Sequence, residues 1–315
     1  MALPPPSNLS TLSFLLTTLA TLFVTASLRL LVILSNSHSR PQRRQPGTPT
    51  RILIVLGSGG HTHEMFYLLR GLDTSKYTHR TYVVSSGDAF SAQRAVEFEQ
   101  NLETLAKERG TAEAQPEPPS QAQSQSQSQS QSQSQSQGQQ KQDTTEEGVG
   151  GGVATRRRRA PTILRTPHLG RQHYNIATIP RARLIHQSLL TTPFTSLYTL
   201  LSAIPILLSS PPLLPDSPPQ DAFEAAACDL PDLIITNGPA TAVIVVLASL
   251  LLKFFNVRGV QGRGKCRTVY VESFARVKTL SLSGRLLLRV VDRFLVQWEE
   301  LEGAGGRAEF WGLLV

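Results

Sequence analysis

The sequence is poor in cysteine, and the cysteines that it has form no pattern. Cys228 and Cys266 are the two cysteines among 315 residues, and they lie far apart without the spacing of metal ligands. This argues against a disulfide framework and against a zinc site. So few cysteines suit a domain in a reducing compartment, and we expect the chain to hold no metal ion.

Two nucleotide-binding signatures are also missing. The dinucleotide fingerprint G-x-G-x-x-G is incomplete, because Gly57 and Gly59 fit it but Thr62 occupies the position of the third glycine. The next predicted strand ends at residues 85 and 86 without the acidic residue that binds a ribose. The phosphate-loop pattern G-x-x-x-x-G-K-[ST] does not occur. Binding of NAD or ATP is therefore weakly supported, and we expect no cofactor on this chain.

Positive charge is absent from the N-terminal end. No Lys or Arg precedes Arg29, and residues 9–28 carry no charge and are rich in leucine. About 20 apolar residues span a bilayer core. A cleaved signal peptide would need a basic start and a small-residue cleavage site, so we favour an uncleaved transmembrane anchor over residues 1–34. A basic linker follows at 35–50, and the positive-inside rule then places the C-terminal bulk in the cytosol.

A long segment in the middle of the chain is almost without apolar residues. Residues 115–152 are rich in Pro, Ser and Gln and include a run of Ser-Gln pairs. This composition predicts a disordered insertion, which we place at 111–172. Four arginines at 156–159 form either a solvated linker or a contact with anionic lipid. About 200 residues remain, which is enough for one α/β domain and not for two.

The remaining sequence is organised around Arg51–Leu72. Residues 52–56 are a run of Ile, Leu and Val, which is typical of a strand buried on both faces. Gly57-Ser58-Gly59-Gly60 follows, and then apolar residues recur at helical spacing. A strand, a glycine turn and a helix open a doubly wound α/β domain. Such a turn offers N–H groups and the positive end of a helix to a phosphate, although a tight connection without a ligand is the alternative.

Strands and helices alternate along the rest of the chain. We expect strands at 76–85, 176–179, 232–236, 268–272 and 293–297. We expect helices at 88–109, 188–208 (interrupted by Pro193 and Pro205), 240–255 and 282–291. This alternation predicts a single Rossmann-like α/β domain with a parallel sheet, whose ligand lies outside the carboxyl ends of the strands.

Several stretches are similar to one protein family. They are the hydrophobic N-terminus, LGSGGHTHEM (56–65), DLIITNGPA (232–240) and the long VYVESFARVKTLSLSGRLLLRVVDRFLVQWEEL (269–301), and IPRARLIHQS (179–188) also fits. Together they resemble the membrane-anchored subunit of the eukaryotic UDP-N-acetylglucosamine transferase that works early in N-glycan assembly. The resemblance covers nearly all of the ordered chain, and the Gln/Ser-rich insertion favours a fungal source.

The resemblance implies a glycosyltransferase of the two-Rossmann GT-B type that is split between two chains. This chain would be the acceptor-side half with an anchor, and a soluble partner subunit would bind the UDP-N-acetylglucosamine donor. The pair would add the second N-acetylglucosamine to dolichyl-diphosphate-N-acetylglucosamine, on the cytosolic face of the endoplasmic reticulum or nuclear envelope. The chain would be inactive alone and would bind no nucleic acid. The residue count agrees, because a two-domain transferase with one domain here needs a second chain.

The resemblance also implies a set of site residues. An inverting transfer needs a general base for the acceptor hydroxyl, and His61 at the glycine turn is the candidate. A histidine that merely caps the turn is the alternative. Glu272 either pairs with Arg276 or assists the acceptor hydroxyl, because an unpaired carboxylate is costly at the end of a buried strand. The candidate acceptor-binding residues are Gly57, Ser58, Gly59, Gly60, Thr62, Glu64, Asn237, Gly238, Glu272, Ser273 and Arg276. The candidate partner-binding residues are Phe310, Leu313, Leu314 and Val315.

Two other functions stay open at this point. The chain could be a pure membrane-recruitment adaptor, with every catalytic group on the partner. It could also be a nucleotide-dependent membrane reductase that acts alone. The missing third glycine and the missing ribose-binding acid count against the reductase.

Overall fold

The computed structural model describes residues 8–36, 47–114, 167–182, 187–188, 190–209, 219, 221–238 and 240–314. The chain divides into two units, Met1–Glu108 with Arg165–Val315 and Arg109–Leu164, and the sheet and the site below belong to the first. Most of the predicted insertion lies outside the described residues. The helix before it, α3 (Ala89–Ala114), runs beyond the predicted end at 109.

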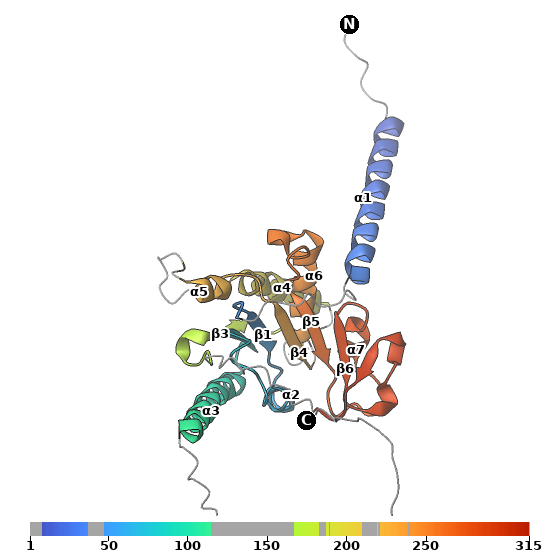
Figure 1. The fold of residues 1–315 in the computed structure, drawn as a ribbon. Helices are drawn as coiled ribbons and strands as arrows, with labels where there is room; N and C mark the ends of the chain where they lie inside the picture. Colours follow the sequence, from blue (N-terminus) through green and yellow to red (C-terminus); the bar gives the residue numbers. More distant parts are fainter. Residues whose placement is uncertain are drawn as a thin grey trace, which may run out of the picture. The chain divides into compact units, whose positions relative to one another are not determined.

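A seven-stranded parallel sheet confirms the predicted Rossmann-like α/β fold (Figure 1). Its strands are β1 (Arg51–Val55), β2 (His79–Ser85), β3 (Tyr174–Ile179), β4 (Leu233–Asn237), β5 (Arg267–Val271), β6 (Arg293–Val296) and β7 (Ala308–Phe310). Their order across the sheet is β3-β2-β1-β4-β5-β6-β7. Successive strands are therefore added on one side of β1 and then on the other. The switch between the two directions lies between β1 and β4.

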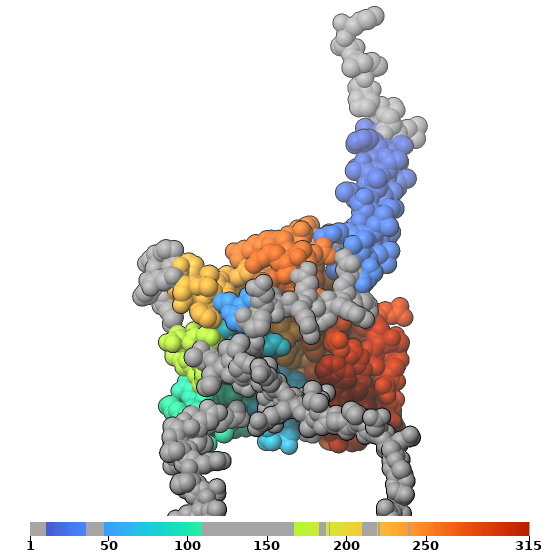
Figure 2. Space-filling view, in the orientation of Figure 1, coloured from blue at the N-terminus to red at the C-terminus, as the bar shows by residue number. Residues whose placement is uncertain are grey.

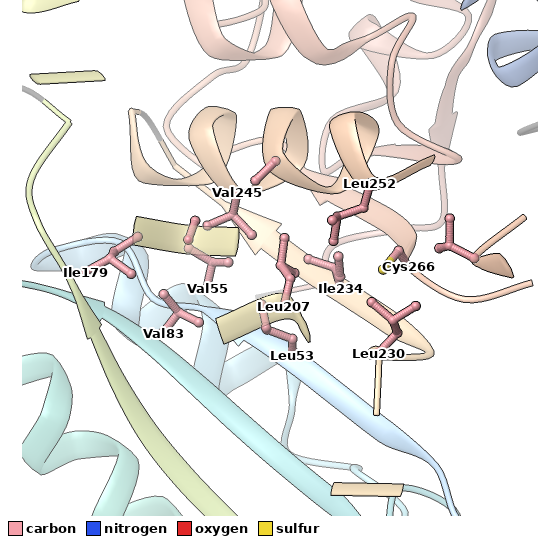
Figure 3. Packing of buried hydrophobic residues seen from close by; sticks show 13 residues of the cluster. Leu53, Val55, Val83, Ile179, Leu207, Leu230, Ile234, Val245, Leu252 and Cys266 are labelled. Atoms are coloured by element: carbon pink, nitrogen blue, oxygen red, sulfur yellow. The ribbon is translucent and has the colours of Figure 1, made fainter. Parts of the chain in front are cut away.

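Alternating apolar residues of β1 serve both faces of the sheet, as the two-residue period of a strand requires. Leu53 and Val55 belong to a core cluster with residues of α4 (Thr192–Leu208) and α6 (Thr241–Phe254) (Figure 3). Ile52 and Ile54 belong to another cluster, with residues of α2 (Gly60–Leu68) and α3. Both faces are covered, which explains why β1 lacks polar residues after Arg51.

Two further helices complete the described α-helices of the domain. They are α5 (Ala222–Ala227), which we did not predict, and α7 (Leu282–Leu287), which is shorter than predicted. Short 3-10 turns occur at Arg171–His173, Val257–Gly259, Glu299–Leu301 and Ala304–Gly306. A third core cluster, around Tyr270 and Phe294, joins α6 and α7 to the second half of the sheet.

The prolines do not interrupt α4, contrary to the prediction. Pro193 lies in the first helical turn, where its missing N–H costs nothing, and Pro205 lies inside the last turn. The helix has no charged residue. Phe194, Leu197, Tyr198 and Leu201 are nevertheless exposed along it.

The N-terminal helix α1 (Asn8–Asn36) is, among the described residues, the one helix long and apolar enough to cross a membrane. Its candidate span is Thr11–Ser35, and only 6% of the most apolar stretch of this span is buried. Figure 2 shows the surface of this helix in blue. The Arg29 side chain donates hydrogen bonds to the backbone oxygens of Lys253 and Phe254, 3.3 Å and 3.1 Å away. A cation at the carboxyl end of a helix is favourable, so Arg29 ties α1 to the end of α6.

Candidate functional site

The glycine turn joins β1 to α2 at the switch point of the sheet. Gly59 precedes the helix with a φ of 64°, a left-handed value that favours glycine. The first N–H groups of a helix have no partner within it, and Ser58, Gly59 and Gly60 are exposed at this position. Thr62, however, is buried and bonds inward, to Gly57 O and to Ser91 Oγ. The turn can therefore bind an anion, whereas the Thr62 side chain stabilises the turn from its buried side and is not free to bind the anion.

The His61 side chain lies between two glycines from neighbouring strand ends. A Cβ atom on Gly57 would come within 2.7 Å of His61 Cβ, and one on Gly238 within 2.9 Å of His61 Cγ. Asn237 Nδ2 also donates a hydrogen bond to His61 O, at 2.7 Å. The ends of β1 and β4 thus hold His61 in the crevice where open α/β sheets bind ligands.

Glu64 and Ser273 join His61 in one hydrogen-bonded group. Glu64 is one helical turn after His61, and its Oε2 lies 3.4 Å from His61 Nδ1. Ser273 follows the end of β5, and its Oγ donates to Glu64 Oε1 at 3.0 Å. These three candidate residues, predicted from two distant parts of the sequence, therefore meet at one place.

Glu272 does not pair with Arg276, although we considered that pairing. The carboxylate is 1% exposed and accepts hydrogen bonds from Ser273 N, Ser281 N and Ser281 Oγ. Both carboxylate oxygens therefore accept hydrogen bonds from the loop that follows β5, and they stabilise the conformation of that loop. The Arg276 side chain is exposed and makes no hydrogen bond or ion pair with other described residues, so it is available for a ligand.

Arg181 is a cation at the same edge that the sequence analysis left out of the site. It follows β3, and its Nε donates to Ser86 O at the end of β2, at 2.9 Å. Its terminal nitrogens have no hydrogen-bond partner in the part of the chain that the structure describes. The motif IPRARLIHQS, which carried part of the resemblance, contained the signal for it.

Tyr270 supports the crevice from within the sheet. Its hydroxyl lies 3.4 Å from Gly238 O and 3.4 Å from Ser281 Oγ. Burial raises the pKa of Tyr270 above its ordinary value, and the nearby Glu272 carboxylate acts in the same direction. The phenol therefore stays protonated and can donate a hydrogen bond to Gly238 O.

The candidate partner-binding residues differ in their exposure to solvent. Phe310 belongs to β7 and packs against a core cluster, so it is not a free tail residue. Leu313 is 61% exposed and Leu314 is half-buried. Val315 lies outside the described residues. Within the described ranges, no group of three or more His, Cys, Asp or Glu side chains could hold a metal ion.

Comparison with known proteins identifies the family. Residues 52–112 and 120–314 match the family described as "Oligosaccharide biosynthesis protein Alg14 like". The chain belongs to the Alg14 family. The match spans both strand ends that hold His61 and the loop that holds Ser273, and it confirms the resemblance stated above.

Curated members of the Alg14 family align with three quarters or more of the chain. The UDP-N-acetylglucosamine transferase subunit alg14 of Schizosaccharomyces pombe is 30% identical over 302 residues, which are 96% of this chain and 99% of the relative. The Aspergillus fumigatus subunit is 34% identical over 76% of this chain and 92% of its own length. The Mus musculus subunit is 29% identical over 87% and 88%. No solved structure matches this chain significantly.

Proposed function

We propose that this chain is the membrane-anchored, acceptor-side subunit of a two-chain N-acetylglucosaminyltransferase. Its donor, UDP-N-acetylglucosamine, binds to a soluble partner subunit, and this chain binds no cofactor. The observation that carries the proposal is the position of His61, held at the switch point of a single Rossmann-like sheet in a member of the Alg14 family. One such domain is half of a GT-B enzyme, which is why a partner is needed.

The proposed acceptor is dolichyl-diphosphate-N-acetylglucosamine. The glycine turn and the exposed Arg276 are positioned to meet its diphosphate, because backbone N–H groups at a helix start and a guanidinium both favour anions. Arg181 adds a second guanidinium at the same edge. The sugar of the acceptor then lies next to His61.

The proposed reaction is an inverting transfer. The acceptor hydroxyl passes its proton to Nε2 of His61 while its oxygen forms a bond to the anomeric carbon of the donor. The bond between that carbon and the UDP oxygen breaks, and UDP leaves with the bonding electrons. His61 then returns the proton to water. In this proposal the donor site lies on the partner, so the chain is inactive without it.

The proposed location is the endoplasmic reticulum membrane, with the domain in the cytosol. Helix α1 supplies the span, and the arginines after it favour the cytosolic side for the domain. The exposed, uncharged face of α4 supports a position close to a membrane surface. The partner subunit is recruited there, and the exposed Leu313 at the C-terminal end is a candidate contact.

A pure recruitment adaptor is the alternative, and substitution of His61 separates the two. We expect His61→Ala to keep the complex with the partner and to lower kcat by about a hundredfold or more, the usual worth of a general base. His63→Ala is the matched control, because His63 lies on the same helix but lines the groove between α2 and α3. Full activity in the assembled His61→Ala enzyme would favour the adaptor.

A further inference from the structure

We propose that Glu64 is the positioning residue for His61, and that Ser273 fixes Glu64 from the other side. Glu64 accepts a hydrogen bond from Nδ1–H of the imidazole and so leaves Nε2 free to take the proton of the acceptor hydroxyl. This inference rests on the proposed function of His61. It changes the predicted role of Glu64, which we had expected among the acceptor-binding residues.

The geometry occupies both carboxylate oxygens of Glu64. Oε2 lies 3.4 Å from His61 Nδ1, and Oε1 accepts from Ser273 Oγ at 3.0 Å. An ionised carboxylate can only accept hydrogen bonds, so this contact is a hydrogen bond when the imidazole carries a hydrogen on Nδ1. The Nδ1 contact is at the long end of the range. Catalytic hydrogen bonds of this kind tighten when substrate binds.

The imidazole cannot turn freely away from Glu64. Gly57 and Gly238 lie so close to the His61 side chain that even a Cβ atom on either would collide with it. Asn237 holds the backbone oxygen of the same residue. The ring is 28% exposed and the Glu64 side chain only 16%, so the accessible group of the pair is the imidazole.

A hydrogen-bonded path links Glu64 to the first turn of α7. Ser281 caps α7 by accepting from Gly284 N, and its N–H and hydroxyl both donate to Glu272 Oε2. Glu272 Oε1 accepts from Ser273 N, and the Ser273 hydroxyl reaches Glu64. The buried Glu272 therefore fixes the positions of Ser273 and Ser281, and Ser273 in turn fixes the Glu64 carboxylate by its hydrogen bond.

A double-mutant cycle in the assembled two-chain enzyme tests the inference. The variants are Glu64→Ala, His61→Ala and the double variant, assayed with saturating donor and varied acceptor. We expect Glu64→Ala to lower kcat about tenfold to a hundredfold, the usual range for an orienting partner, with the KM of the acceptor little changed. On the His61→Ala background, Glu64→Ala should cost nothing further, because residues that act through one another are not additive.

Three further variants sharpen the result. Glu64→Gln keeps an oxygen that can accept from Nδ1 and should recover part of the lost kcat. Ser273→Ala should lose less than Glu64→Ala, since it removes only the support. Glu108→Ala is the matched control, an exposed carboxylate on α3 whose removal should change nothing.

Several outcomes would overturn the inference. A raised acceptor KM with unchanged kcat would make Glu64 an acceptor-binding residue. An equal further loss on the His61→Ala background would show that Glu64 acts independently or structurally. If Glu64→Ala fails to assemble with the partner, the cycle is run with Glu64→Gln instead. A loss of kcat that is equal in the wild-type and His61→Ala backgrounds would then overturn the inference. Full activity of the assembled enzyme that carries only the His61→Ala substitution would instead contradict the proposed function.

Discussion

Gly238 determines, at the scale of single residues, whether His61 can occupy the crevice. It has a φ of 75° and lies at the end of β4, directly beside the imidazole. Gly57 plays the same part at the end of β1. Strand ends at a switch point are where a ligand approaches, and here they are also where two glycines leave room for a side chain. A larger residue at either position would move His61.

Gly238→Ala should therefore abolish most transfer activity without unfolding the protein. An alanine in the left-handed region costs about 1–2 kcal/mol, and its Cβ would lie 2.9 Å from His61 Cγ, so the ring must shift. Gly264→Ala is the matched control, with a φ of 60° and no atom within 4 Å of the new Cβ. In a thermal melt, Gly264→Ala should show the loss of stability from the backbone strain alone, and Gly238→Ala should show at least as large a loss. Equal activity of the two assembled enzymes would show that the close approach to His61 is unimportant.

Several residues that the sequence marks as candidates lie together in the structure, but the sequence analysis left out Arg181, and it did not predict which side chains bond to one another. His61 and Gly57–Gly60 follow from a turn that is local in the chain. Ser273 and Glu64 are 209 positions apart, and only the order of the strands brings them together. Glu272 has an obvious candidate partner in Arg276, four residues on, yet its bonds are to Ser273 and Ser281. Hydrogen-bond partners of this kind depend on loop conformation, which residue types do not specify.

At the scale of elements, α3 is held to the sheet by a buried ion pair. Arg80 on β2 donates to both oxygens of Glu99 on α3, at 2.6 Å and 2.7 Å, and Tyr82 donates to Glu99 as well. The two charged side chains are 0% and 1% exposed. Arg80 also donates to His168 O, so the same guanidinium contacts the segment that leads into β3.

Removing one member of this pair should be costly. Glu99→Gln leaves the Arg80 guanidinium buried without a counter-charge, and we expect the free energy of unfolding to fall by about 3–5 kcal/mol. Glu97→Gln on the same helix removes a pair with Arg94 in which both side chains are 40% exposed, and should cost less than about 1 kcal/mol. Chemical or thermal unfolding of the purified protein measures both. Similar losses in the two variants would contradict this account of α3.

Regular elements were easier to foresee than short or irregular ones. The runs of Ile, Leu and Val in β1 and β4 indicate strands by themselves. The strand β7 has three residues, AEF, with a charge in the middle, and it exists because it pairs with β6. The prolines of α4 were misread because their effect depends on position, and both lie in terminal turns. Local sequence therefore predicts the elements that bury much apolar surface.

For the molecule as a whole, acid should be destabilising because of a buried histidine. His79 is 7% exposed, and burial, together with the charges of Arg51 and Arg80, lowers its pKa to about 3 from an ordinary 6.5. Below pH 6.5 the unfolded chain takes up a proton that the folded chain refuses. The stability linked to His79 is therefore fully present above pH 6.5 and is lost as the pH falls towards 3.

His79→Gln should weaken this acid sensitivity. One such proton makes the free energy of unfolding fall by up to about 1.4 kcal/mol per pH unit within that window. The variant should be less stable than the wild type at pH 7.5 but should lose less stability on going to pH 5. Melting temperatures of both proteins between pH 7.5 and 5 give the comparison. Parallel curves would show that His79 does not carry the effect.

The central claim is that this chain is half of an enzyme, and a three-way transfer assay tests it most directly. Transfer from UDP-N-acetylglucosamine to a short-chain diphosphate-linked N-acetylglucosamine lipid is measured with this chain, with the soluble partner, and with both. We predict product only in the mixture, because the proposed function divides the acceptor site and the donor site between the two chains. Product from this chain alone would contradict the account, since a single Rossmann-like domain would then hold both substrates. No product in the mixture, with both chains folded and bound to each other, would contradict the proposed reaction itself.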